Sequence, residues 1–215
     1  MAQPNVTRAS VTFRAAVPSF QTPMQTIEPR EVRKMNRIPT HTVDDAPQAC
    51  RQLLENVIQF SPTGRPLNLH GQMAHSPAVL VAYTSLRKAT AEHGTVGPQL
   101  SAALMLAAGS AVGNDYVVAI TGRLAQLAGW THEQIAALRA GNTTGDDKLD
   151  AIVRLVREAT ANSGQVSDTT WSNAVDTGWS AEQLTEAFAY LGLTVFTAYF
   201  LNYAQTDLDI PVAAR

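Results

Sequence analysis

The chain has 215 residues, of which 45% are hydrophobic and 16% are charged, and its formal net charge is −2 at pH 7. A chain of this size can bury one sizeable core or two small ones, and its near-neutral charge argues against the basic face that binds nucleic acid. The only cysteine, Cys50, excludes an intrachain disulfide and fits a reducing compartment, so we expect a cytoplasmic protein.

The apolar stretches are short, whereas a membrane-spanning helix needs roughly 20 consecutive apolar residues. The longest stretches, 100–112 and 191–201, are typical of core helices, so we expect no membrane partner. The charged fraction lies below the quarter or so that is usual for a globular domain. These features together indicate that further copies of the chain cover part of the surface.

Residues 1–34 differ in composition from the rest of the chain. Arg8 and Arg14 stand among Ser, Thr and Pro residues, and the segment up to Ile27 contains no acidic residue. Such a composition is typical of organelle transit peptides, but a flexible tail, an arm on a neighbouring subunit and a true start at Met35 fit it as well. We treat residues 1–34 as a flexible or arm-like extension and residues 35–215 as the folded domain.

From residue 37 onward, apolar residues recur at the three- and four-residue spacing of helices, and no segment alternates as a strand does. Helix starts carry hydroxyl or acidic caps, and Pro77 follows Ser76 at a typical first-turn position. We therefore predict an all-α protein. The predicted helices cover residues 47–58, 67–74, 77–93, 98–112, 116–128, 132–140, 168–177 and 181–203, with one more that begins at 146–147.

A seven-residue pattern occurs twice in the second half of the chain. Residues 129–135 (Gly-Trp-Thr-His-Glu-Gln-Ile) match residues 178–184 (Gly-Trp-Ser-Ala-Glu-Gln-Leu). In each copy a glycine ends one helix, and a hydroxyl residue and a glutamine form the capping box of the next. Convergence of two good helix starts and duplication of a helical hairpin both explain the pattern. The sequence thus predicts a bundle with a weak internal helical-hairpin repeat.

The stretch 113–131 lies at the centre of the chain, where the polar break Gly113-Asn114-Asp115 separates two helices. Over residues 37–211 the sequence resembles the alkylhydroperoxidase-D (AhpD) and carboxymuconolactone decarboxylase family. The resemblance implies an AhpD-like helical bundle that assembles as trimers or dimers of trimers. It is carried, besides the central stretch, by residues 37–39 (Arg-Ile-Pro), 74–77 (Ala-His-Ser-Pro), 136–141 (Ala-Ala-Leu-Arg-Ala-Gly) and 178–182 (Gly-Trp-Ser-Ala-Glu).

Peroxidase members of this family carry a Cys-x-x-Cys pair at a helix start, with a histidine after it and a glutamate before it. The resemblance places the two cysteines on Asn114 and Val117, the histidine on Thr121 and the glutamate on Ala102. Thiol peroxidase chemistry needs an activated thiolate and a resolving thiol, and these four residues supply neither. Cys50 lies far upstream in another helix. We therefore predict a degenerate redox site without disulfide-cycling activity.

Our first functional hypothesis is a non-thiol enzyme, of a lyase or decarboxylase type, that acts on a small organic carboxylate or lactone. The decarboxylase branch of the family also lacks the cysteine pair. Histidine serves as a general acid or base near neutral pH, and N–H groups at a helix start hold anions. The candidate catalytic residues are His75, Asn114, Tyr116 and Thr121, and the candidate pocket-lining residues are His70, Tyr83, Ala102, Asp115 and Val117.

Two alternatives stay open. One is a non-catalytic member that binds a small ligand or acts as a scaffold, because Ala102 and Val117 make the former redox site apolar. The other is a peroxidase by family membership alone. The scattered histidines show no metal-ligand spacing, so we expect no metal and no cofactor. The expected partners are further copies of the chain, as a trimer or hexamer, and a small-molecule ligand.

Overall fold

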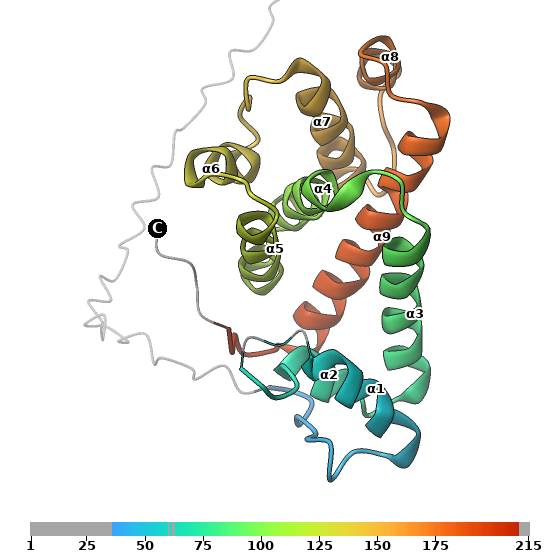
Figure 1. The fold of residues 1–215 in the computed structure, drawn as a ribbon, viewed down its shortest axis with the longest axis vertical. Helices are drawn as coiled ribbons and strands as arrows, with labels where there is room; N and C mark the ends of the chain where they lie inside the picture. Colours follow the sequence, from blue (N-terminus) through green and yellow to red (C-terminus); the bar gives the residue numbers. More distant parts are fainter. Residues whose placement is uncertain (1–35, 60, 62, 211–215) are drawn as a thin grey trace, which may run out of the picture. The chain divides into compact units, whose positions relative to one another are not determined.

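The computed structural model describes residues 36–59, 61 and 63–210, and within these ranges it contains nine α-helices and no strand (Figure 1). The predicted all-α fold is therefore confirmed. The extension expected over residues 1–34 and the start at Met35 lie outside the described residues. The helices are α1 (Gln48–Ile58), α2 (Asn68–Met73), α3 (Pro77–His93), α4 (Gly97–Val112), α5 (Asp115–Leu127), α6 (His132–Ala140), α7 (Asp147–Ala161), α8 (Asp168–Asp176) and α9 (Ala181–Ala204).

The central helix is α4, which packs against α5, α6, α7 and α9. Its buried residues are mostly small, among them Ala103, Ala107 and Ala108. Small side chains let neighbouring helices approach closely. At Gly109 a Cβ atom would lie only 2.7 Å from Cγ1 of Val117 on α5. The apolar composition on nearly all sides of this helix predicts its central position, and the structure shows it there.

A tight turn joins α4 to α5. Gly113 ends α4 with a φ of 73°, a left-handed conformation that glycine adopts without steric cost. Asn114 then caps α5, because its Oδ1 accepts a hydrogen bond from the N–H of Val117 at 2.9 Å. The Nδ2 of Asn114 donates to Oδ1 of Asn202 at 2.7 Å. The turn is thereby linked to the last turn of α9.

The sequence repeat corresponds to a repeated local structure. Both α6 and α9 begin with a complete capping box. In the first copy Trp130 Nε1 donates to the carbonyl of Gln99, in the first turn of α4, at 2.8 Å. In the second copy Trp179 Nε1 donates to the carbonyl of Lys148, in the first turn of α7, at 2.7 Å. Each tryptophan thus ties the start of one helix to a carbonyl 31 residues earlier, in the first turn of another helix.

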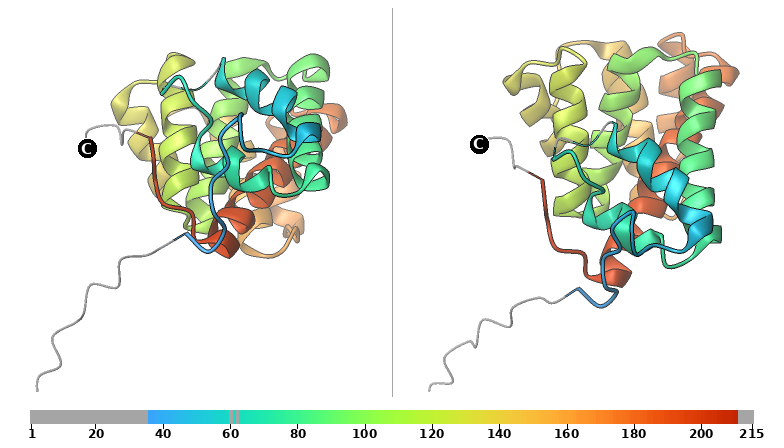
Figure 2. Two further views of the ribbon diagram at one scale, coloured as in Figure 1. Left: turned by 90° about the horizontal axis from the view of Figure 1, so that it is seen from below. Right: turned by 60° about the horizontal axis from the view of Figure 1, so that its bottom comes forward.

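The helices that matter for the site surround one region of the bundle. In Figure 1, α3 and α5 stand on opposite sides, α4 lies above, and α1 and α2 lie below. Figure 2 shows α1 and α2 across this lower end in two further views. Helix α9 contacts α3, α4 and α5. These contacts place segments that are far apart in sequence around a common interior.

Helix α9 has one buried face and one exposed aromatic face. The exposed face carries Phe188, Phe196, Tyr199 and Tyr203, which are 65%, 38%, 60% and 72% exposed. Spacings of three, four and eight residues keep these side chains on one side of the helix. No charged residue occurs between Glu186 and Asp207. We call these four residues the aromatic stripe.

By length and composition, α9 is also the one helix of the described residues that could cross a membrane, with a mean hydropathy of 1.4 over 18 residues. Half of that window is buried against the rest of the bundle. Core helices pass the same test, so this feature is weak evidence for a membrane span.

The contact between α4 and α5 yields the first prediction. We expect Gly109→Ala to lower the free energy of unfolding by about 1–3 kcal/mol, since the new methyl group collides with Val117. Gly122→Ala on α5 is the matched control, because its Cβ would meet only the flexible end of Arg139, at 3.4 Å. Urea denaturation measures the free energy of unfolding of both variants. Equal stability of the two variants would contradict the close contact.

Candidate functional site

A cavity of about 810 Å³ lies among α1, α2, α3, α4, α5 and α9. Its volume falls within the range of small-molecule binding sites. Most of the wall surface is apolar, and Val57, Leu67, Met105, Leu124 and Leu193 contribute to it. Among the described residues, α6, α7 and α8 contribute nothing to the wall. The cavity therefore suits a compact, largely apolar molecule.

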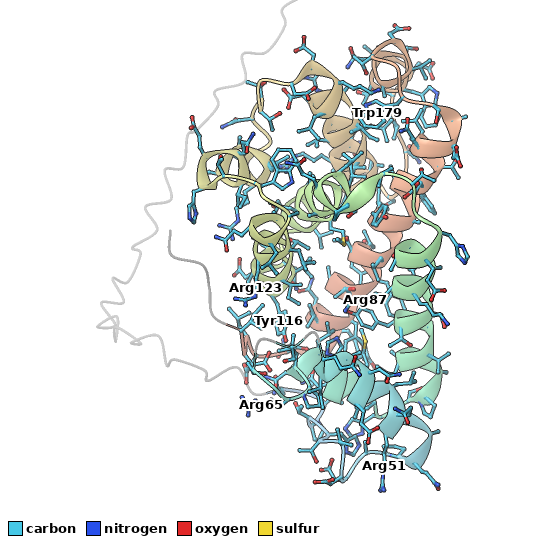
Figure 3. All side chains as sticks on the ribbon, viewed as in Figure 1. Arg51, Arg65, Arg87, Tyr116, Arg123 and Trp179 are labelled. Carbon is cyan, nitrogen blue, oxygen red and sulfur yellow. The ribbon has the colours of Figure 1, made fainter. Side chains whose placement is uncertain are left out.

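Three polar side chains meet on one wall of this cavity. Nε2 of His70, on α2, lies 3.4 Å from the hydroxyl of Tyr83, on α3. Nη1 of Arg87 lies 3.5 Å from the same hydroxyl. Tyr83 and Arg87 share a face of α3 because they are four residues apart, and Figure 3 shows Arg87 reaching from α3 toward the interior. The Tyr83 hydroxyl thus links an imidazole to a guanidinium. We call these three residues the polar trio.

His70 is held in its neutral form. It is only 4% exposed, and burial together with the nearby charge of Arg87 lowers its pKa from 6.5 to about 3. Its Nδ1 atom has no hydrogen-bond partner among the described residues. Buried polar atoms are nearly always paired, so this nitrogen, which is itself buried, adds to the cost of charging the ring.

The charge on the cavity wall is entirely positive. Arg87 and Arg123 line it, and no Asp or Glu of the described residues does so. Neither arginine is within salt-bridge distance of a carboxylate in the described part of the chain. Arg87 is half-buried and Arg123 is exposed. An apolar cavity with two uncompensated cations favours an anionic ligand.

The loop between α3 and α4 forms part of the cavity wall, at Gly94. Glu186, on α9, accepts hydrogen bonds from the backbone N–H of Thr95 at 2.9 Å and from that of Val96 at 3.3 Å. At Gly94, a Cβ atom would lie 2.4 Å from the backbone carbonyl oxygen of Thr90 and 2.6 Å from the Tyr190 hydroxyl. Glycine is therefore required at this position, and the loop is fixed directly against α9.

Four of the predicted site residues line the cavity: His70, Tyr83, Val117 and Thr121. Thr121 is 4% exposed, and its hydroxyl donates to the carbonyl of Val117 at 2.8 Å. The hydroxyl hydrogen of Thr121 is thus engaged in a hydrogen bond within α5 itself. Where the family resemblance expects a histidine and a cysteine, the cavity wall carries a methyl-bearing and an isopropyl side chain.

The structure does not bring Ala102, or the predicted residues Asn114, Asp115 and Tyr116 of the central stretch, to the cavity. Asn114 serves as the helix cap, and Asp115 is exposed in the first turn of α5. Tyr116 is buried, and its hydroxyl donates to Oδ1 of Asp209 at 2.5 Å. Ala102 is buried in the core between α4 and its neighbours. The first turn of α5 faces α9 and the chain after it, which explains these positions.

His75 also lies away from the cavity. It is exposed at the entry to α3, and its Nε2 lies 2.9 Å from the carbonyl oxygen of Pro39. Its ring lies 4.0 Å from that of His41, measured between centroids. These contacts join the segment before α1 to the start of α3. The geometry gives His75 a structural role at a helix entry.

Sequence reasoning gave no site role to several residues that line the cavity. Arg87 and Arg123 are the most informative, because they supply its charge. The i, i+4 spacing of Tyr83 and Arg87 is a visible signal that the two share a helix face. Hydroxyl residues of α9 also line the cavity, and they occur within an apolar run that predicts only a core helix. They are Tyr190, Thr194 and Thr197.

Groups for thiol chemistry are absent from the described cavity wall. Cys50 is fully buried in α1 and does not line the cavity. Burial raises the pKa of its thiol, which disfavours the reactive thiolate. In the described residues, no three His, Cys, Asp or Glu side chains are grouped as metal ligands.

Solved structures of other proteins share this fold. An uncharacterised peroxidase-related protein from Ralstonia eutropha JMP134, described as an alkylhydroperoxidase AhpD core, superposes with a TM-score of 0.71 at 15% identity, over 81% of this chain and 92% of that one. A peroxidase-related protein from Silicibacter sp. TM1040 gives 0.66 at 14% identity, over 86% and 96%. The AhpD-like helical fold expected from the sequence is therefore confirmed.

The same fold occurs in the debrominase Bmp8, whose C82A variant has been solved in complex with 2,3,4-tribromopyrrole. That structure matches with a TM-score of 0.69 at 16% identity, over 80% of this chain and 91% of that one. No protein-family model and no curated protein matches the sequence. At these identities the likeness defines the fold alone.

The neutral state of His70 yields the second prediction. The unfolded chain takes up a proton at this side chain below about pH 6.5, whereas the folded protein does so only near pH 3. The stabilising contribution of His70 is therefore present above pH 6.5 and is lost as the pH falls toward 3. We expect His70→Gln to flatten the fall in unfolding free energy over this window by up to about 1.4 kcal/mol per pH unit.

The control for this measurement is His93→Gln, at the exposed end of α3. Urea denaturation from pH 7 to pH 4 compares the two variants with the unaltered protein. Identical pH slopes for His70→Gln and the unaltered protein would contradict a neutral, buried His70.

Proposed function

We propose that this chain is a member of the AhpD and carboxymuconolactone decarboxylase family that binds a small organic anion in its cavity. The observation that carries the proposal is the polar trio of His70, Tyr83 and Arg87 in a largely apolar cavity without an acidic side chain. An apolar body fits the walls, and a carboxylate fits the guanidinium of Arg87. Arginine is well suited to this role, because its planar fork matches a carboxylate.

The reaction that fits this site is acid–base chemistry without a thiol, on a small carboxylate or lactone. A neutral imidazole donates a hydrogen bond to a carbonyl oxygen at pH 7, and Tyr83 can donate beside it. When a substrate loses carbon dioxide, the electron pair of the broken bond moves onto an enolate. Donors aimed at the enolate oxygen stabilise it, and a solvent proton then reaches the carbon.

Binding without turnover is the second candidate function, and the side chains that α5 presents to the cavity favour it. The hydroxyl of Thr121 is bonded to a backbone carbonyl, and Val117 beside it is inert. The debrominase neighbour holds a small halogenated ring, so the fold does not dictate decarboxylation. Peroxidase activity is the least supported candidate, since the chain has one cysteine and it lies outside the cavity. A cytoplasmic location is part of the proposal and rests on that same cysteine count.

The third prediction concerns ligand charge. We expect Arg87→Gln to weaken benzoate binding by roughly 10- to 100-fold, the range for loss of a charge-assisted hydrogen bond, while uncharged benzamide binds as before. Lys88→Gln is the matched control, because Lys88 is the next residue on α3 but is exposed and pairs with Glu92. Isothermal titration calorimetry measures the affinity of each variant, and of the unaltered protein, for benzoate and for benzamide. An equal loss for both variants would show that only net charge matters.

The same variants separate an enzyme from a binding protein. Proton NMR follows a panel of carboxylated lactones and β-keto acids incubated with the protein. Turnover that His70→Gln reduces and Cys50→Ser leaves unchanged supports the acid–base enzyme. Benzoate binding without any turnover in the panel supports the binding protein, and dithiol-dependent hydroperoxide turnover would overturn the proposal as a whole.

We also propose that copies of this chain associate through the aromatic stripe of α9. Its four side chains expose roughly 500 Å² if a full aromatic side chain presents 150–250 Å², a large share of the ~800 Å² per partner in a standard interface. The stripe carries no charge, so two copies of it can meet without electrostatic repulsion. A trimer or hexamer, as the family resemblance implies, needs such a surface.

The fourth prediction tests this surface. We expect the double variant Phe188→Glu, Tyr203→Glu to reduce the mass measured by light scattering at micromolar concentration to that of one chain, because like charges then face each other. Val81→Glu, at an exposed position on α3, is the control and keeps the assembled mass. A single-chain mass for the unaltered protein would contradict the association.

A further inference from the structure

The chain after α9 folds back across the lower end of the bundle. Gln205 ends α9 in the left-handed region, with a φ of 50°. Residues 205–210, which we call the C-terminal strap, then run from the foot of α9 past α2 toward α5 (Figures 1 and 2). Thr206 begins this course with a 2.5 Å hydrogen bond from its hydroxyl to Oε1 of Gln72 on α2.

Both carboxylate oxygens of Asp209 hold the strap in place. Oδ1 accepts the hydroxyl hydrogen bond of Tyr116, on α5, at 2.5 Å. Oδ2 accepts from the backbone N–H of Asn68, the first residue of α2, at 2.8 Å. The Asn68 side chain donates in turn to the carbonyl of Asp207 at 3.0 Å. One side chain thus fastens the strap to two helices that lie on different walls of the cavity.

Tyr116 remains a hydrogen-bond donor to Asp209 because its environment keeps the phenol protonated. Tyr116 is only 4% exposed. Burial, with the hydrogen bond and charge of Asp209, raises the pKa of its phenol, so the hydroxyl stays protonated and remains a donor. Removing Asp209 would leave this buried donor unpaired, which is costly.

Ile210 follows directly and becomes part of the cavity. It is 6% exposed, and it packs in the same apolar cluster as Leu67, Tyr83 and Val117. Of the strap residues it alone lines the cavity. The position of one apolar wall side chain therefore depends on the neighbouring carboxylate.

We propose that Ile210 is a specificity-determining residue of the cavity and that Asp209 is the positioning residue that holds it there. The strap closes the wall between α2 and α5, so it limits the length of the apolar body that fits. This inference rests on the proposed function, because it takes the cavity as the ligand site. Tyr116, at the other end of the hydrogen bond, acts through Asp209 and does not touch the ligand.

The test uses two probes of one chemistry, benzoate and 4-butylbenzoate, in calorimetric titrations of the full chain. The readout is the ratio of their affinities. We expect Ile210→Ala to raise the ratio in favour of 4-butylbenzoate by roughly fourfold for each methylene that gains room. Asp209→Ala and Tyr116→Phe are expected to shift it in the same direction, with Tyr116→Phe the smaller because Asn68 still holds the strap.

Asp207→Ala is the matched control. Asp207 lies two residues earlier in the strap, and its hydrogen bonds with the described residues use only its backbone N–H and carbonyl. Thermal unfolding checks that each variant is folded. Should Asp209→Ala fail to fold, Ile210→Ala and Tyr116→Phe decide the question.

The outcomes separate this inference from the proposed function. An unchanged ratio in Ile210→Ala, with benzoate binding still dependent on Arg87, overturns the strap inference alone. A shift in Ile210→Ala that Tyr116→Phe and Asp209→Ala do not share overturns the positioning role of Asp209. Absence of benzoate binding to the unaltered protein overturns the proposed function itself.

Discussion

At Gly109 the backbone of α4 lies so close to Val117 on α5 that no side chain fits between them. This contact fixes the helix pair at the centre of the bundle, and the turn at Gly113 sets the direction in which α5 leaves it. Because α5 is placed in this way, Val117 and Thr121 face the cavity while the preceding turn faces α9. The division of α5 into a cavity face and a support face therefore follows from one close approach.

The cavity joins two physical properties that rarely coexist without a purpose. Apolar walls exclude water, which strengthens any charge interaction inside. The same walls carry an arginine with no acidic neighbour and an imidazole that burial keeps neutral. Burying such groups costs free energy unless each has its partners. The small organic anion that we propose as the ligand would supply a partner for the guanidinium.

The starts of α6 and α9 could be predicted well because their caps are local: the hydroxyl and glutamine of each capping box lie within four residues of each other. Ser76 was expected to cap α3 in the same way, but its side chain makes no capping hydrogen bond. The site could be predicted only in part. Tyr83 was found because helical spacing places it on an inner face, and Thr121 because the family resemblance places a site histidine at its position. Asn114 and Tyr116 were misplaced because their partners are 88 and 93 residues away, and no local pattern reveals such contacts. Arg87 was passed over because a charge on a helix is usually a solvated one.

The loop between α3 and α4 shows how much of the cavity wall depends on one carboxylate. Glu186 accepts hydrogen bonds from the N–H groups of Thr95 and Val96, and Gly94 packs beside it without room for a methyl group. The hydroxyl of Thr95 donates to the same carboxylate, at 2.6 Å. Because these bonds share one acceptor residue, loss of the Glu186 carboxylate removes all of them at once, and the loop is then left with side-chain packing such as that of Val96.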